Sequence, residues 1–192
     1  MVIGGIASQA PLKKMQAVVL KKIPIREYDE LVICYTKDAG KQVYQVKSVL
    51  LPTSKQAGHL DILNLVDFSL VTPKSFASGQ SKNSHPIITS AYCLEAFPRL
   101  KSSLSAMAAA FFLLECFDKL IFEGEPDSKL WNFLISKLHY YDTPLESTRT
   151  ALVIADSRQE LLKILGYDSS MPIEHLANSQ FRSLQFARQV IK

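Results

Sequence analysis

Residues 16–47 read QAVVLKKIPIREYDELVICYTKDAGKQVYQVK, and this stretch decides how the first half of the chain is interpreted. An apolar run that carries two lysines is followed by the polar break Arg26–Asp29. The next apolar run, Glu30–Thr36, leads through the turn Lys37–Gly40 into a third run, Lys41–Leu50. Strands joined by short polar turns form a meander, and a meander of this kind opens small Greek-key barrels.

Two later segments supply the strands that such a barrel still needs. Leu65–Val71 alternates, with Val66, Phe68 and Leu70 on one face, which is the period of a half-buried strand. Ile87–Leu94 is the fifth predicted strand, and the first is predicted over Gln16–Ile25. The polar segments between the third, fourth and fifth strands are predicted to be loops.

The second half of the chain carries helix signals. We expect Ser102 or Ser103 to cap a helix that runs to about Phe122, with an apolar centre that makes it the hub of this half. The remaining predicted helices are one capped by Asp127 that runs through Tyr141, one from the capping box Thr143–Glu146 to Gly166, and one over Ile173–Ile191.

The sequence therefore predicts an α+β protein of two domains. We expect an N-terminal tail over residues 1–14, an OB-type β-barrel over 15–98 and an all-α domain over 99–192. No apolar run reaches the roughly 20 residues of a membrane span, and the N-terminus lacks the pattern of a secretory signal. The expected location is therefore cytoplasmic.

Few residues in the chain suggest chemistry. Cys34, Cys93 and Cys116 are far apart and lie in apolar segments, so a disulfide or zinc framework is not expected. The sequence holds no glycine-rich phosphate loop, no Gly-x-Ser-x-Gly elbow and no His-Glu-x-x-His motif. We therefore predict a protein that is not an enzyme, without catalytic residues, metal or cofactor.

The distribution of charge indicates a polyanionic partner for the first half. Residues 1–100 hold 12 Lys and Arg against 7 Asp and Glu, whereas residues 101–192 hold 10 against 11. Cations that follow a nucleic-acid backbone, combined with aromatic rings that stack on bases, are typical of single-strand binding. On an OB barrel, strands two and three and the nearby loops form the usual face for this. The candidate nucleic-acid contacts are Lys21, Lys22, Arg26, Lys47, Lys55, Lys74 and Arg99.

Three tyrosines are the aromatic candidates near this face: Tyr28, Tyr35 and Tyr44. For Tyr35 and Tyr44, packing within the barrel is at least as plausible an interpretation as stacking on a base. Each lysine, taken alone, is also compatible with an ordinary solvated surface charge. The prediction therefore depends on the set of cations and not on any one member.

Several segments, in this order, resemble the RecO family of recombination mediators. They are Ala17–Leu20, Ile25–Val32 and Tyr35–Lys41, the stretch Pro52–Leu60, the segment Ala91–Leu100 that leads into an alanine-rich helix, and Leu161–Tyr167. The resemblance extends from about Met15 to Ile191. It implies an N-terminal OB fold, a helical C-terminal domain and a mediator that binds and anneals DNA.

The resemblance also implies partners. Proteins of the RecO family bind single- and double-stranded DNA, work with RecR, and help load RecA onto DNA coated by single-strand-binding protein (SSB). They contact the acidic, apolar C-terminal tail of SSB, and an acidic apolar tail suits a cation beside an apolar groove between helices. We place that contact near Arg158 and Lys163.

The sequence departs from the family in ways that leave a second interpretation open. Only Asp168–Asn178 separates the Leu-Gly-Tyr segment from the last predicted helix, so the family's four-cysteine zinc module is missing and this is a short form. The basic stretch after the third strand is reduced to Lys47 and Lys55. The alternative is a non-catalytic adaptor that binds the SSB tail but binds DNA only weakly.

Overall fold

The computed structural model describes residues 13–73, 84–144, 149–177 and 180–190. Five strands close into a barrel in the order β1-β2-β3-β5-β4, with β4 returning to pair with β1. This order, with its parallel β3–β5 closure, confirms the predicted OB-type barrel. The strands are β1 (Lys13–Pro24), β2 (Glu30–Thr36), β3 (Gly40–Val46), β4 (Leu65–Val71) and β5 (Ile87–Glu95).

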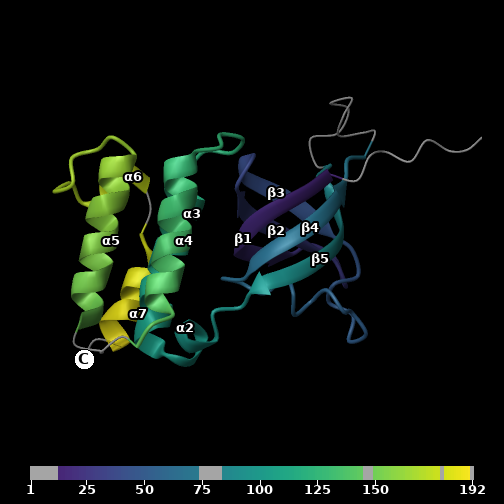
Figure 1. Cartoon of the computed structure of the whole chain (residues 1–192), viewed down its shortest axis with the longest axis horizontal. Helices are drawn as coiled ribbons and strands as arrows, with labels where there is room; N and C mark the ends of the chain where they lie inside the picture. Colours follow the sequence, from purple (N-terminus) through teal and green to yellow (C-terminus); the bar gives the residue numbers. More distant parts are fainter. Residues whose placement is uncertain (1–12, 74–83, 145–148, 178–179, 191–192) are drawn as a thin grey trace, which may run out of the picture.

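The helices form a separate layer beside the barrel, as Figure 1 shows. α3 (Leu104–Leu120) lies at the centre of this layer, and its apolar middle section is buried as predicted. The other helices are α2 (Pro98–Ser102), α4 (Ser128–Tyr141), α5 (Thr150–Ile164), α6 (Ile173–Ala177) and α7 (Arg182–Val190). The mixed α+β class is therefore confirmed.

 α3 packs against α2, α4, α5, α6 and α7, which makes it the hub of the helical half.

Local signals place most helix ends where the sequence predicts them. The Ser103 side chain accepts a hydrogen bond from the Ala106 N–H at the start of α3. Asp127 accepts from the N–H groups of Lys129 and Leu130 at the start of α4. α5 ends at Ile164, and Gly166 follows with φ +80°, a left-handed conformation that glycine adopts without strain just after a helix.

Some predicted boundaries are wrong. β1 begins at Lys13, three residues before the predicted start, and β3 ends at Val46 because Ser48 turns away with φ +54°. α2, directly before α3, was not predicted. The capping box Thr143–Glu146 lies partly outside the described residues, and α5 begins at Thr150.

The single helix predicted over Ile173–Ile191 is also wrong, because the structure has two helices there, α6 and α7. The Glu115 carboxylate on α3 accepts hydrogen bonds from the backbone N–H groups of Arg182 and Ser183. These are free N–H groups of the first turn of α7, so a side chain distant in the sequence caps a new helix at this point.

Side chains on the two surfaces of the barrel belong to two different clusters. The interior holds alternate residues of every strand, including Ala17, Cys34 and Phe68. The outer side chains of β1 and β2, including Val18, Leu20 and Tyr35, join the core of the helical half. The barrel and the helices therefore share one hydrophobic cluster outside the barrel interior.

Tyr35 is the centre of this junction. Its ring is fully buried and meets the Phe117 ring of α3 edge-on, with 5.0 Å between centroids. Its hydroxyl donates to the backbone carbonyl of Asp127 over 3.3 Å. Burial of the ring is the largest influence on the Tyr35 phenol and raises its pKa.

The β2–β3 turn forms a second contact with the helices. The Gly124 N–H donates to the Lys41 carbonyl over 3.0 Å, and Lys41 forms a parallel bridge with Glu123. Lys41 is 8% exposed and donates from Nζ to the Asp118 carbonyl over 2.6 Å. Burial is the main cause that lowers the pKa of this lysine.

Gly40 makes this contact possible, and its replacement provides a test. The residue has φ +64°, and a Cβ atom there would lie 2.2 Å from the Glu125 carbonyl oxygen. We expect Gly40→Ala to lower the free energy of unfolding by at least roughly 1–3 kcal/mol, the cost of backbone strain, with the clash adding to it. Urea denaturation measures this difference.

Gly58 is the matched control, because a Cβ atom there has nothing within 4 Å and its φ is not positive. Gly58→Ala should change the free energy of unfolding by no more than about 0.5 kcal/mol. Equal stability of the two variants would show that the turn does not depend on the close approach of Gly40.

Candidate nucleic-acid interface

The β1–β2 loop and the segment after β3 lie side by side at one end of the barrel. We call this surface the barrel rim and define it as Ile25–Asp29 together with Lys47–Lys55. The Asp29 carboxylate joins the two parts, since it accepts from the Ser48 N–H at 2.8 Å and from the Gln45 side-chain amide at 3.2 Å. The Leu50 N–H also donates to the Tyr28 carbonyl over 3.1 Å. The rim is therefore a fixed surface.

Three of the predicted cations lie on the rim. Arg26 has a side chain that is 72% exposed, and its guanidinium lies 3.8 Å from Asp29. Lys47 and Lys55 are exposed, and neither has an ion pair with another described residue. A surface charge without an acidic partner is available to a phosphate.

Lys21 and Lys22 were also predicted to contact nucleic acid, and the structure gives each an acidic partner. Lys22 Nζ lies 2.9 Å from Glu30 Oε2, and the lysine side chain is 19% exposed. Lys21 Nζ lies 2.9 Å from Asp118 Oδ2 on α3. The second pairing joins residues 97 positions apart, so no local sequence pattern indicates it.

The other predicted site residues are dispersed. Lys74 lies outside the described residues. Arg99 lies on α2 and not on the rim. Its side chain is exposed and has no ion pair among the described residues. Arg158 is half-buried and Lys163 is exposed, both on α5. The Arg158 Nε atom is buried and has no hydrogen-bond partner within the described part of the chain.

The helices cover part of the outer face of strands two and three, so those side chains are not open to a nucleic acid. Tyr35 packs against α3, and Val43 of β3 packs against the same cluster. Tyr44 faces the barrel interior, where its ring meets Phe68 with 4.9 Å between centroids. Of the three candidate tyrosines, only Tyr28 is exposed, to 42%.

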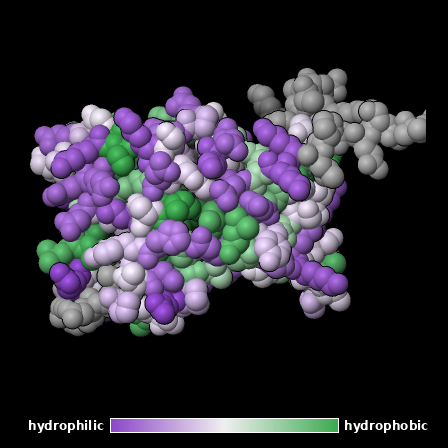
Figure 2. Space-filling view, viewed as in Figure 1, coloured by the Kyte–Doolittle hydropathy of each residue, from purple (hydrophilic) through white to green (hydrophobic). Residues whose placement is uncertain are grey.

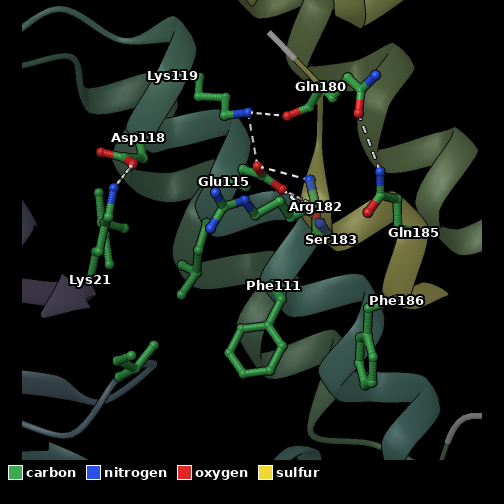
Figure 3. Close-up of a pocket in the computed structure, with 13 residues that line it drawn as sticks. Lys21, Phe111, Glu115, Asp118, Lys119, Gln180, Arg182, Ser183, Gln185 and Phe186 are labelled. Atoms are coloured by element: carbon green, nitrogen blue, oxygen red, sulfur yellow. Dashed lines mark hydrogen bonds and ion pairs between the residues drawn. The ribbon is translucent and has the colours of Figure 1, made fainter.

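A groove of about 910 Å³ lies between β1, α3 and α7, and Figure 3 shows its lining. The apolar lining comes from both halves of the protein: Leu20, Ile62, Phe111, Leu114 and Phe186. Figure 2 shows hydrophobic side chains gathered where the helices meet the barrel. The rim and this groove are therefore two separate surfaces.

Charged residues along the groove are mostly paired. Lys21 pairs with Asp118, and Lys119 Nζ lies 2.9 Å from Glu115 Oε1. Arg182 is exposed, and its guanidinium has no ion pair with a described residue. No local pattern in the sequence indicates this groove, because its walls come from four segments distant in the chain.

Glu115 holds α7 against α3 and so forms one wall of the groove (Figure 3). Besides the two backbone N–H groups, its carboxylate accepts from Ser183 Oγ at 2.5 Å. Burial is the largest single influence and would raise the pKa of this carboxyl. The hydrogen bonds from Ser183, Lys119 and Arg182 together outweigh it, so the pKa is lowered.

Comparisons with known proteins agree with this architecture. Residues 11–81 match the family model described as "Recombination protein O N terminal". Proteins with the name DNA repair protein RecO are 28% identical over 126 residues in Desulforamulus reducens and 28% over 136 residues in Shouchella clausii. These alignments cover 66% and 69% of this chain.

The chain is similar to proteins of the RecO family over its barrel and into its helical half. The matches cover 46% and 48% of those two relatives, so the chain spans about half the length of the curated RecO proteins it matches. A RecO protein of Dehalococcoides mccartyi is 25% identical over 154 residues, which is 80% of this chain and 56% of that relative. The resemblance thus continues into the helical half.

Between Asp168 and Ala177 the chain forms a turn and the short helix α6. No group of three or more His, Cys, Asp or Glu side chains within the described ranges could hold a metal ion. None of the described helices is both long enough and apolar enough to cross a membrane.

The lowered pKa of Glu115 predicts a pH-dependent attachment of α7. A carboxyl whose pKa is lower in the folded state stabilises the fold above its unfolded pKa, and this contribution is lost as the pH falls through the folded pKa. We expect Glu115→Gln to cost about 2 kcal/mol at neutral pH, the scale of hydrogen bonds to a charged group. The difference from the wild type should shrink in acid. Urea denaturation of both proteins at neutral and at acidic pH measures this difference in the free energy of unfolding.

Glu174 on α6 is a suitable control, because no hydrogen bond or ion pair of its side chain is found among the described residues. Glu174→Gln should leave the pH dependence of unfolding close to that of the wild type. A Glu115→Gln protein whose deficit stays constant down to acidic pH would contradict the assignment.

Proposed function

We propose that this protein binds single-stranded DNA through the barrel rim and acts as a mediator of recombination in DNA repair. The observation that supports this most is the fixed rim of a RecO-like barrel, which presents Arg26, Lys47 and Lys55 beside the exposed ring of Tyr28. Cations next to an exposed aromatic ring suit a strand whose phosphates and bases are both accessible.

The cellular role that we propose follows the family. The protein would anneal complementary strands, act with RecR, and help load RecA onto DNA coated by SSB. This role requires no bond to be made or broken by the protein, so it is a non-enzymatic one. Binding to double-stranded DNA would use the same rim, but through the phosphates alone, because paired bases are not accessible to Tyr28.

The rim cations provide the direct test. Phosphate contacts release counterions, so the affinity for single-stranded DNA should fall steeply as salt is raised. Replacement of Arg26, Lys47 and Lys55 by alanine should weaken binding by at least tenfold at low salt and reduce the slope of log affinity against log salt. Fluorescence anisotropy with a labelled oligonucleotide measures both quantities.

The matched control replaces Lys129, Lys163 and Arg188 by alanine, which removes the same charge from the helices. If that control weakens binding as much as the rim variant does, only net charge matters and the rim is not the site. An intact wild-type protein that does not bind single strands at low salt would refute the proposed function itself.

The groove favours a second candidate function, an adaptor that binds the SSB tail. An apolar lining beside the Arg182 guanidinium, which has no ion pair with a described residue, suits a peptide that ends in apolar residues and a carboxylate. Phe111 and Phe186 meet at this lining, with 6.4 Å between ring centroids. The predicted contact near Arg158 and Lys163 does not line this groove, so the two locations are separate alternatives.

A synthetic peptide with acidic residues followed by apolar ones and a free C-terminal carboxylate tests the adaptor. If the groove holds it, Arg182→Ala should weaken binding about tenfold, which is the scale of a charge-assisted hydrogen bond. The Arg158→Ala, Lys163→Ala double variant should then bind normally, and the opposite pattern would favour the α5 location. Isothermal titration calorimetry on the full chain separates these outcomes.

A further inference from the structure

The helices leave one face of the barrel sheet open. On the outer surface of β1, Val18 and Leu20 are covered by helices, whereas Lys14 is exposed. The neighbouring outer positions of β4 and β5 are also open, and together they surround a shallow depression of about 280 Å³. We call this surface the open sheet face and define it by Lys14, Asp67, Ser69, Ser90 and Tyr92.

Tyr92 is the most accessible aromatic ring on the described part of the barrel, with 65% of the residue exposed. His59 supports it, because the two rings are stacked at 30° with 5.8 Å between centroids. The His59 ring is itself fixed, since its Nδ1 accepts a hydrogen bond from the Cys93 N–H over 3.3 Å. The His59 ring thus supports the Tyr92 ring from one side.

The groups around the ring are polar, and two of them have no ion pair among the described residues. Asp67 lies directly opposite Tyr92 in the β4–β5 register, and it is exposed. Neither Asp67 nor Lys14 has an ion pair with any residue of the described segments, although both line the same depression. A carboxylate, an ammonium group and an exposed ring therefore converge on one small area, and neither charge is paired within the described part of the chain.

We propose that the open sheet face is a second contact for single-stranded nucleic acid, where one base stacks on Tyr92. Lys14 would hold the adjoining phosphate. Asp67 would accept a hydrogen bond from the exocyclic amine of the base, the contact that carboxylates make with the N4 amine of cytosine. Thymine has no such amine, so the site favours cytosine or adenine over thymine.

The choice of ligand rests on the proposed function, but the location does not involve the rim. A polar, shallow area with a single aromatic ring offers little apolar surface for a protein partner, whereas a base needs only a ring to stack on and edge groups to pair with. Two separate contacts on one barrel would let a strand follow the surface from one to the other, or let two strands bind together.

Tyr92→Ala tests the stacking. Loss of a base–aromatic stack should weaken binding of oligo(dC) roughly fivefold or more. Tyr92→Phe keeps the ring and should bind like the wild type. Tyr167→Ala, which removes a tyrosine that is 45% exposed at the end of α5, is the matched control and should change nothing. Anisotropy with oligo(dC) and oligo(dT) measures each affinity.

Asp67→Asn tests the base preference. Removal of a negative charge should add the same electrostatic gain to the binding of every sequence. The informative quantity is therefore the ratio of the affinities for oligo(dC) and oligo(dT), in which this gain cancels. The asparagine amide can donate to the thymine O4 as well as accept from an amine, so the ratio should fall toward one. A wild-type ratio near one, or a ratio that Asp67→Asn leaves unchanged, would overturn the assignment of Asp67.

The outcomes separate this inference from the proposed function. If the rim variant loses affinity and Tyr92→Ala does not, the rim binds DNA and the second contact does not exist. If Tyr92→Ala loses affinity and the rim variant does not, the open sheet face is the principal site and the rim assignment fails. A wild-type protein that binds neither oligonucleotide overturns both.

Discussion

The packing of α3 against the outer face of the barrel is the constraint on which the rest of the structure depends. The Tyr35 ring, buried between the barrel and Phe117, makes the outer side chains of β1 and β2 part of the helical core. Removal of large apolar side chains from water is the main favourable term in such packing. The two halves therefore stabilise each other, and each would expose apolar surface without its neighbour.

This packing also decides which surfaces remain for binding. An OB barrel usually offers the face of its second and third strands, and here Tyr35 and Val43 of those strands join the helical core. The surfaces left are the barrel rim, the open sheet face and the groove where the halves meet. Binding residues must therefore be sought at the edges of the covered face and on the opposite side of the sheet.

The sequence predicts local features well and distant pairings poorly. Features that depend on neighbouring residues could be identified in advance. They are the strand alternation, the Ser103 and Asp127 caps and the glycine after α5, Gly166. The Lys21–Asp118 pair and the capping of α7 by Glu115 join segments 97 and 67 or 68 residues apart. Periodicity and spacing contain no information on such pairs, which explains why the Asp118 partner of Lys21 was not predicted.

The bridge between Lys41 and Glu123 has a further consequence, for association between molecules. β3 pairs with β5 only at Gln45 and Val46, so the first half of β3 has one edge without a strand neighbour in the barrel. An uncovered edge of this kind is a template on which another chain can add a strand. The α3–α4 connection occupies part of that edge through the Gly124 hydrogen bond, and so it protects the barrel against edge-to-edge aggregation.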